Sequence, residues 1–508
     1  MELQLKQASI DAYETAGEIV LAQEETAETI VPDYCPDIAR VIEASGVVFL
    51  HSREVREGRA ELSGTVQVTI LYTPEGEGGI RNLEFSVPFQ VSSDNRSLAE
   101  CTALAAETEA ESLETRLLNP RKLFTHCKLV TRLTAYRRRP LTYAADVECD
   151  QPLEKRVERQ HAVVLTQIAA RDFTFTDELS ISPGRPGAEE LLSARVYPVV
   201  QETRIIGNKL IFKGIFTLSL LYLDLDGGCN SYTGELPFSQ ILDVEGTPED
   251  AQATVRLQLT GIDLQIGSDP DGRQIEAALY LHAFALLRQE RDLELLSDLY
   301  STACEVRFEA APLSAASWYD CQTRRQSVRE LLELGMAADA ILAVRVQCGA
   351  VSVSREGADT VLRTTAAIRV LYRDEGGVPL AAERRVDVSC ETDLPENAAV
   401  TARASCPEEP QASIGERGIE VRFPVEFVIE AENEVKKIRV VSAQLDVDAP
   451  RDTSAAPSLV LRRLNPDETA WDLAKAYNST IADILEANQF SEAELPRDRL
   501  LLIPRRRA

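Results

Sequence analysis

The sequence contains few of the residues on which most enzymes depend for proton transfer and metal binding. Only four of its 508 residues are histidine, and they are far apart in the chain: His51, His126, His161 and His282. His126 and Cys127 are adjacent in an expected strand, so their side chains would point to opposite faces and form a poor ligand pair. The Gly-x-x-x-x-Gly-Lys-Ser/Thr, Gly-x-Ser-x-Gly and His-Glu-x-x-His motifs are all absent. The sequence therefore predicts a protein that is not an enzyme and that holds no metal or cofactor.

Paired cysteines and long apolar runs are also missing. The ten cysteines occur singly and none forms a Cys-x-x-Cys pair, which argues against zinc fingers and a redox dithiol. No apolar run approaches the roughly 20 residues that span a bilayer. Residues Met1–Lys6 lack the basic start and apolar core of a secretory signal. We therefore expect a cytoplasmic protein without membrane insertion, in which the cysteines are small buried hydrophobic residues.

The charge is strongly one-sided. The chain has 54 Lys and Arg residues against 82 Asp and Glu residues, a formal net charge of −28. Such a field repels phosphate backbones and anionic headgroups, so we expect neither a nucleic-acid partner nor a membrane-surface partner. Residues 459–508 hold eight basic and eight acidic residues, so the acidic surplus lies entirely in residues 1–458. The acidity has two interpretations, which are solubility of the chain and attraction of a basic partner.

What the chain does contain is a self-match at a spacing of 150 residues. Each repeat has the apolar-apolar-tyrosine end of a strand, followed by a glycine pair: Ile70-Leu71-Tyr72 with Gly78-Gly79, Leu220-Leu221-Tyr222 with Gly227-Gly228, and Val370-Leu371-Tyr372 with Gly376-Gly377. Gly64 and Gly214 have the same offset, whereas Thr364 occupies this position in the third repeat. Because solenoid repeats are ~20–50 residues long, a repeat of this length indicates a copied domain.

Each repeat is expected to be rich in strands. Apolar and polar residues alternate in Glu61–Tyr72, the period-two pattern of a strand with one buried face. Lys209–Tyr222 and Val361–Tyr372 repeat the pattern, and the glycine pair supplies the positive φ that a hairpin turn needs. The predicted fold class is mainly β, with three related β-sandwich or β-barrel-like modules and a small C-terminal domain.

Helices are expected to be scarce in this fold. The longest expected helix covers Asp320–Leu334, and Asp37 is placed to N-cap a short turn over Ile38–Ile42. A stretch of prolines and small residues after Asp448 indicates a linker. The predicted domains are β-rich modules 1–160, 161–312 and the more divergent 313–447, a linker 448–458, and a C-terminal domain 459–508.

The C-terminal domain differs in kind from the repeats. A short strand over Val460–Arg462 is followed by a helix from Ala470 to Tyr477, a second helix capped by Thr480, and a closing strand at Leu500–Pro504. This β-α-α-β order resembles a LysM domain over its full length. The resemblance rests on matching residues in matching order: Thr469, Trp471, Leu473, Ala474, Tyr477, Ile484, Leu485, Asn488 and Leu502-Ile503-Pro504.

The LysM resemblance implies a binding function for this domain. LysM domains commonly bind N-acetylglucosamine polymers through two loops, and Asp467 and Arg497 stand here where those loops usually have glycine. A side chain at such a position crowds a sugar, so a protein partner is favoured. The candidate partner-binding residues are Trp471, Lys475, Asp467, Asn488 and Arg497. Trp471 itself has two interpretations, a core residue or an interface anchor whose helical face Lys475 shares.

The front of the chain carries a second resemblance. Pro32–Ile38, with the sequence Pro-Asp-Tyr-Cys-Pro-Asp-Ile, the strand Gly64–Tyr72 and the run Leu83–Phe89 look like a repeat family of unassigned biochemistry from spore-forming bacteria. Such repeats joined to one C-terminal LysM domain are similar to SipL-type spore coat morphogenesis proteins. The resemblance implies a scaffold in the mother-cell cytoplasm that concentrates at the forespore surface. It also implies that the LysM domain binds the coat-basement morphogenetic ATPase, so that coat proteins encase the forespore.

An alternative function remains open from the sequence. The protein is then a binder of peptidoglycan or another N-acetylglucosamine polymer, acting at the spore cortex or the cell wall.

Overall fold

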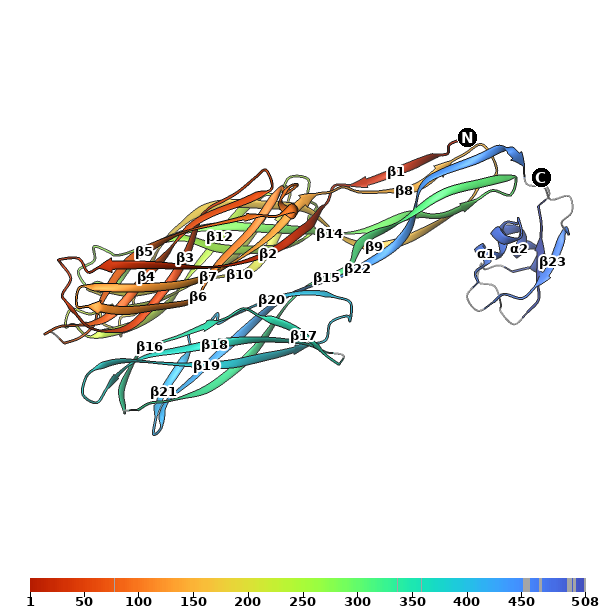
Figure 1. The fold of residues 1–508 in the computed structure, drawn as a ribbon. Coiled ribbons are helices and arrows are strands. Elements are labelled where there is room, and N and C mark those ends of the chain that lie inside the picture. The colour runs from red at the N-terminus through yellow and green to blue at the C-terminus, as the bar shows by residue number, and fades with distance from the viewer. Residues whose placement is uncertain are drawn as a thin grey trace.

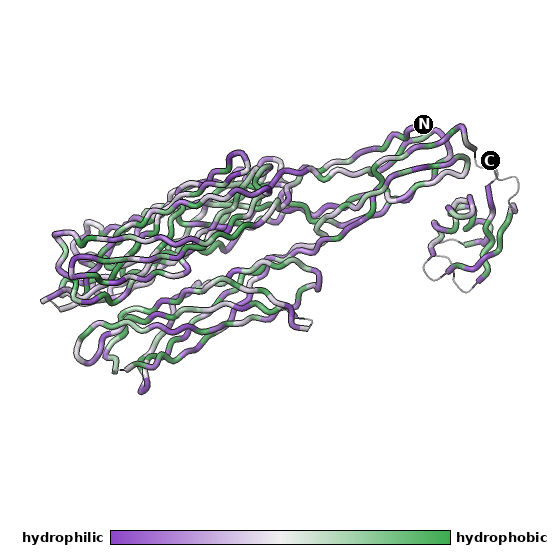
Figure 2. The backbone as a smooth tube through the Cα atoms, viewed as in Figure 1, coloured by the Kyte–Doolittle hydropathy of each residue, from purple (hydrophilic) through white to green (hydrophobic). Residues whose placement is uncertain are grey.

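The computed structural model describes residues 1–76, 78–335, 337–357, 359–450, 457–465, 468–490, 496 and 499–506. The described chain is built almost entirely of antiparallel strands, and its two α-helices lie near the C-terminus (Figure 1). Side chains alternate between buried and exposed along most strands. Figure 2 shows hydrophobic and hydrophilic residues interspersed along the same strands. The mainly β prediction is therefore confirmed.

The first part of the chain forms two packed three-stranded sheets, β2-β7-β6 and β3-β4-β5, and a two-stranded ribbon, β1-β8. Its elements are β1 (Gln4–Ile10), β2 (Tyr13–Ile30), β3 (Ile38–Arg56), β4 (Arg59–Pro74), β5 (Arg81–Asp94), the 3-10 turn η1 (Arg96–Leu98), β6 (Ala103–Asn119), β7 (Lys122–Arg138) and β8 (Leu141–Glu148). Side chains from both sheets share one hydrophobic core, which includes Leu50, Val66 and Leu129.

The next part repeats this arrangement. Its elements are β9 (Glu154–Ser180), β10 (Glu190–Ile206), β11 (Lys209–Leu223), β12 (Cys229–Asp243), β13 (Gln252–Ile266) and β14 (Gln274–Tyr300). The sheet β10-β11-β12 packs on β13-β14-β9 around a second core, which contains Phe212, Phe216 and Leu279.

A third hydrophobic core lies between the strands that follow. These are β15 (Cys304–Glu333), β16 (Ala338–Cys348), β17 (Ser352–Glu356), β18 (Asp359–Asp374), β19 (Pro379–Thr392), β20 (Ala399–Ser405), β21 (Gln411–Gly415) and β22 (Gly418–Pro450). The sheet around β18 packs against β15, β20 and β22, with Ile368, Phe423 and Phe427 in the core. The last elements are β23 (Leu459–Arg462), α1 (Ala470–Ala476), α2 (Ile481–Asn488) and β24 (Leu501–Pro504).

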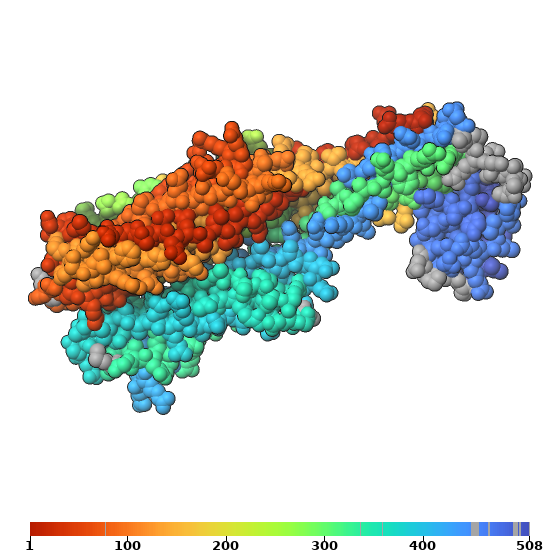
Figure 3. Space-filling view, in the orientation of Figure 1, coloured from red at the N-terminus to blue at the C-terminus, as the bar shows by residue number. Residues whose placement is uncertain are grey.

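Four strands of 27 or more residues extend from this body into an arm (Figure 1). The arm consists of β1, β8 and the ends of β9, β14, β15 and β22 that lie nearest the C-terminal helices. β22 alone has 33 residues, which span roughly 110 Å at the usual rise of a strand. The accessible surface is 26055 Å², whereas a compact protein of this mass exposes about 18,000 Å². The molecule is thus strongly elongated, as the space-filling view also shows (Figure 3).

The long strands also pass through the expected module boundaries. β9, β15 and β22 run without a break through residues 160, 312 and 447. Residues 448–450 belong to β22, while residues 451–456 of the expected linker lie outside the described residues.

Two local predictions of helical structure were wrong. Asp320–Leu334 lies almost entirely within β15, where residues such as Asp320 and Leu332 pair with Ala431 and Ile419 of β22. The spacing of apolar residues in this segment is compatible with a helix or a strand. The segment forms a strand because β22 provides a partner for its backbone. Ile38–Ile42 begins strand β3 rather than a helical turn, and Asp37 accepts a hydrogen bond from Arg121 instead of capping it.

Equivalent positions of the three sequence repeats meet in one hydrophobic cluster. Two sets of residues at 150-residue spacing lie in it: Leu71, Leu221 and Leu371, and Ile42, Leu192 and Leu342. Such contacts are expected of three copies arranged about a common axis. Beside them, the buried Arg345 forms an ion pair with Glu43 at 2.9 Å and donates to the Ser193 hydroxyl. Burial lowers the pKa of Arg345, and the charge of Glu43 opposes this effect.

The glycine positions in the repeats have a steric cause. A Cβ atom on Gly214 would lie 1.9 Å from the Val199 carbonyl oxygen and 2.7 Å from the ring of Phe238. Gly64 is crowded in the same way by Phe49 and Phe89. In the third repeat the residue paired with Thr364 on β19 is Val388, which is smaller than phenylalanine and removes part of this crowding. The Thr364 hydroxyl donates to the Gly349 carbonyl at 2.8 Å. At the hairpins, Gly79, Gly227 and Gly377 have positive φ, as predicted.

The proline-containing segment of the first repeat is a loop held in place by hydrogen bonds from one arginine. In loop 31–37 the Arg121 guanidinium donates to two backbone carbonyls at 3.0 Å and to Asp37 at 2.6 Å. Loop 181–187 of the second repeat is fixed by Arg273, which donates to a loop carbonyl at 2.9 Å. In both loops the backbone carbonyl of the arginine also accepts from the first loop amide. The same loop is therefore built twice by the same kind of contact.

Candidate functional site

The C-terminal helices are defined by side-chain caps. Thr469 N-caps α1, and Asp472 accepts hydrogen bonds from the backbone amide and the hydroxyl of Thr469, at 2.8 and 2.7 Å. The Thr469 hydroxyl holds the pKa of Asp472 below its usual value, so the carboxylate is charged at neutral pH, where it favours a helix N-terminus. Thr480 N-caps α2 by accepting a hydrogen bond from the Asp483 amide at 3.1 Å, and Gln489 ends that helix in a left-handed conformation with φ of 56°. Both caps follow from local sequence.

Asn488 connects the second helix to the closing strand. Its amide nitrogen donates to the carbonyls of Ile484 at 2.7 Å and Leu502 at 2.6 Å, and its oxygen accepts from the Leu502 amide at 2.8 Å. β24 pairs antiparallel with β23, so these bonds hold the sheet against α2. The side chain of Asn488, a predicted site residue, therefore makes its hydrogen bonds within the C-terminal domain.

Replacing Asn488 by alanine should lower the free energy of unfolding of the C-terminal domain by about 2 kcal/mol, because three backbone groups each lose a hydrogen bond. Faster hydrogen exchange in residues 481–488 and 501–504, with unchanged exchange in β11, is the expected measurement. Glu486→Ala, at an exposed position of the same helix, is the matched control. Equal exchange in the two variants would show that Asn488 has no structural role.

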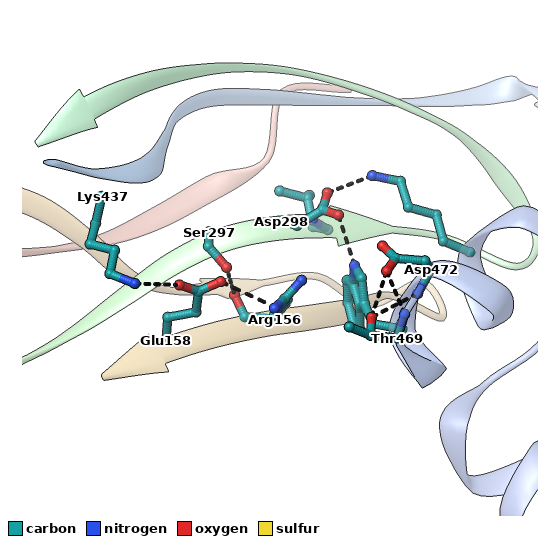
Figure 4. A network of polar contacts seen from close by, with 10 residues as sticks. Arg156, Glu158, Ser297, Asp298, Lys437, Thr469 and Asp472 are labelled. Atoms are coloured by element: carbon teal, nitrogen blue, oxygen red, sulfur yellow. Dashed lines mark hydrogen bonds and ion pairs between the residues drawn. The ribbon is translucent and has the colours of Figure 1, made fainter. Parts of the chain in front are cut away.

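The two predicted partner-binding side chains of α1 both donate hydrogen bonds to one carboxylate of the arm. The Trp471 indole nitrogen donates to Oδ2 of Asp298 at 2.7 Å, and the Lys475 ammonium donates to Oδ1 at 2.6 Å (Figure 4). Asp298 lies near the end of β14, where its Oδ1 also accepts from the Leu299 amide at 2.8 Å. Trp471 and Lys475 are one helical turn apart, so a single carboxylate can accept from both.

The contact continues as a mixed aromatic and polar interface. Tyr300 is 1% exposed, its ring packs edge-on against Trp471 at a centroid distance of 4.9 Å, and its hydroxyl donates to the Ser479 carbonyl at 2.9 Å. The Asn478 amide donates to the Thr302 carbonyl, also at 2.9 Å. Burial raises the pKa of Tyr300, so the hydroxyl stays protonated and remains a donor. These contacts fix the C-terminal domain to the end of the arm.

Charged side chains of the arm flank this interface. Arg156 and Lys437 each form an ion pair with Glu158, at 3.3 and 3.8 Å, and the Ser297 hydroxyl donates to the Arg156 carbonyl (Figure 4). Exposed pairs of this kind contribute little stability. The specificity of docking therefore rests on Asp298 and the aromatic pair beside it.

The five predicted site residues do not form one site among the residues that the structure describes. Trp471 and Lys475 come together on Asp298, Asn488 lies within the C-terminal domain, and Asp467 and Arg497 lie outside the described residues. Both interpretations of Trp471 involve burial, and the side chain is 6% exposed. Asp298 and Tyr300 were missed, because more than 170 residues separate them from α1 and no sequence pattern links them.

The cysteines differ in how deeply they are buried. Burial was expected of all ten cysteines, but only four are buried (Cys127, Cys304, Cys390 and Cys406), while five are partly buried and Cys321 is exposed. Burial raises the pKa of Cys127 to about 11 and that of Cys406 to about 12.

No group of three His, Cys, Asp or Glu side chains in the described ranges is placed to hold a metal ion. None of the helices within those ranges is long and apolar enough to cross a membrane.

The fold defines a class of elongated, repeat-built β proteins with a small helical domain docked on an arm. Residues 37–111 and 188–267 match the family described as SipL, SPOCS domain. These matches support a SipL-type family assignment and are consistent with a sporulation-related protein. The two matched segments cover β3 to about half of β6 and β10 to β13, so they correspond to the first two sequence repeats. A comparison with curated proteins found no match.

Proposed function

We propose that this protein is a non-catalytic scaffold of spore coat assembly in the mother cell. Three copies of one β module form its body, and its C-terminal LysM domain binds the coat-basement morphogenetic ATPase. The bound protein then concentrates at the forespore surface and promotes coat encasement. The proposal is supported by the family match of two repeats and by the resemblance of residues 459–508 to LysM domains.

The elongated architecture is the observation that carries the proposal. The body and arm expose far more surface than a compact chain of the same mass. The C-terminal domain is attached at the far end of the arm, away from the three hydrophobic cores (Figure 1). A protein that joins several partners benefits from such a separation of surfaces.

The docked state defines what a partner of α1 must provide. Trp471 and Lys475 both donate to Asp298 in the chain by itself. A partner that uses these side chains must replace this carboxylate, so we expect it to present an acidic residue beside an apolar surface. The near-neutral C-terminal domain repels such a partner less than the acidic body does.

A binding assay with the purified ATPase tests the proposal. Deletion of residues 459–508 should abolish binding, and Trp471→Ala in the full chain should weaken it at least tenfold because an aromatic anchor is lost. Lys437→Ala is the control and should leave binding unchanged, because this lysine lies on the arm, outside the C-terminal domain. Undiminished binding by the deletion variant would refute the proposal. Binding of N-acetylglucosamine oligomers to the full chain would instead support the alternative function.

A further inference from the structure

A cavity of about 500 Å³ lies where strands from all three parts of the body meet. Its walls come from β2, β6 and β7 of the first part, β13 and β14 of the second, and β15, β20 and β22 of the third. The first and third parts lie side by side along the body (Figure 3). The volume is within the usual range of small-molecule sites, roughly 300–1,000 Å³.

The floor of the cavity carries two arginines and one carboxylate. Arg256 forms an ion pair with Glu430 at 2.6 Å, and both side chains are less than 20% exposed. The Arg288 guanidinium lies 3.8 Å from the centre of the Tyr319 ring, whose hydroxyl donates to Glu430 at 3.3 Å. Burial raises the pKa of Glu430, but Arg256 and Arg288 outweigh it and keep this pKa below its usual value. Glu430 is therefore ionised, and the floor has one positive charge in excess.

The same floor has hydrogen-bond donors without acceptors. Nη1 of Arg288 and Nε of Arg256 are buried and have no hydrogen-bond partner within the described part of the chain. Leaving a buried, charged donor without an acceptor costs free energy. A negatively charged group that accepts hydrogen bonds is therefore favoured beside these two arginines. A carboxylate meets both requirements and matches the planar guanidinium.

The walls and rim restrict what kind of anion fits. The rim carries Glu18 and Glu432, which are exposed and which repel groups of high negative charge, whereas Glu109 is paired with Arg132 at 3.2 Å. At the mouth Arg403 is already paired with Glu107 at 2.9 Å. Apolar side chains form much of the remaining wall, including Ile19, Leu133, Val351, Val400 and Val428.

We propose that this cavity binds a small amphiphilic molecule with a single carboxylate. The carboxylate pairs with Arg288 and neutralises the excess charge, and the apolar remainder lies against the wall residues. Because the walls belong to three parts of the chain, the ligand also stabilises their mutual packing. The proposal does not depend on the function of the C-terminal domain.

Calorimetric titration of the full chain with octanoate tests the proposal. Octanol and octylamine are matched ligands with the same apolar chain but no carboxylate. Octanoate should bind with a stoichiometry of one, at least tenfold more tightly than either. Arg288→Met should reduce octanoate affinity at least tenfold, whereas Arg288→Lys should recover part of it. Arg159→Met, at a highly exposed arginine on β9, should leave affinity unchanged.

Three results would overturn the proposal: no octanoate binding at about 5 mM, equal binding of octanol, or full affinity in Arg288→Met. If that variant does not fold, Cys348 offers a second measurement on the natural chain, because it lines the same cavity. Octanoate should then slow alkylation of Cys348 relative to Cys149 of the arm, as read by peptide mass spectrometry. Equal alkylation with and without octanoate would count against the site as firmly as an absent heat signal.

Discussion

Replacement of Asp298 by alanine should release the C-terminal domain from the arm. The substitution removes the acceptor of two charged or aromatic donors, Trp471 and Lys475, in a partly buried interface. Losing charge-assisted hydrogen bonds of this kind costs about 3 kcal/mol, so docking should weaken by roughly a hundredfold. Hydrogen exchange measures the effect directly: residues 298–304 and 469–480 should lose protection while the hydrophobic cores keep theirs.

A matched control for this experiment lies on the same strand. Asp292 is an exposed residue of β14 that pairs with His161 at 3.2 Å and makes no contact with α1 in the described part of the chain, so Asp292→Ala should leave docking unchanged. The Asp298 variant also bears on the proposed function, because α1 is then freely available. If the partner uses Trp471 and Lys475, the variant binds the ATPase more tightly than the natural chain. Unchanged affinity would mean that the partner contacts another face.

Replacement of Gly214 by alanine should destabilise the body by about 4 kcal/mol or more. The new methyl group would overlap the Val199 carbonyl oxygen and the ring of Phe238, and the carbonyl belongs to a paired strand that cannot move alone. Chemical denaturation should show a large fall in the midpoint. Gly184→Ala is the control, because a Cβ there meets nothing within 4 Å.

The third repeat gives a second check of the same argument. Introducing glycine at Thr364 should cost far less, because only one hydrogen bond and a small side chain are lost. A similar loss for Thr364→Gly and Gly214→Ala would contradict the steric explanation. Phe238→Val, which imitates Val388 of the third repeat, removes only part of the crowding, since the Val199 carbonyl remains.

The sequence by itself determined those features whose causes are local. Alternating apolar residues defined strands such as β4 and β11, since one buried face imposes a period of two. Thr469 and Thr480 fixed the starts of the helices, because a cap needs only residues three positions away. The positive φ of Gly227 followed from the turn that joins two neighbouring strands.

Only the tertiary structure decided features that depend on distant partners. Asp320–Leu334 became a strand because β22 offers a full set of backbone partners, which no local pattern reveals. Trp471 lies against Tyr300 and Asp298 because the arm brings the end of β14 to α1. Likewise, the cavity beside Arg288 exists only where three parts of the chain converge. Packing between segments hundreds of residues apart depends on shape and charge in space, and a linear pattern carries neither.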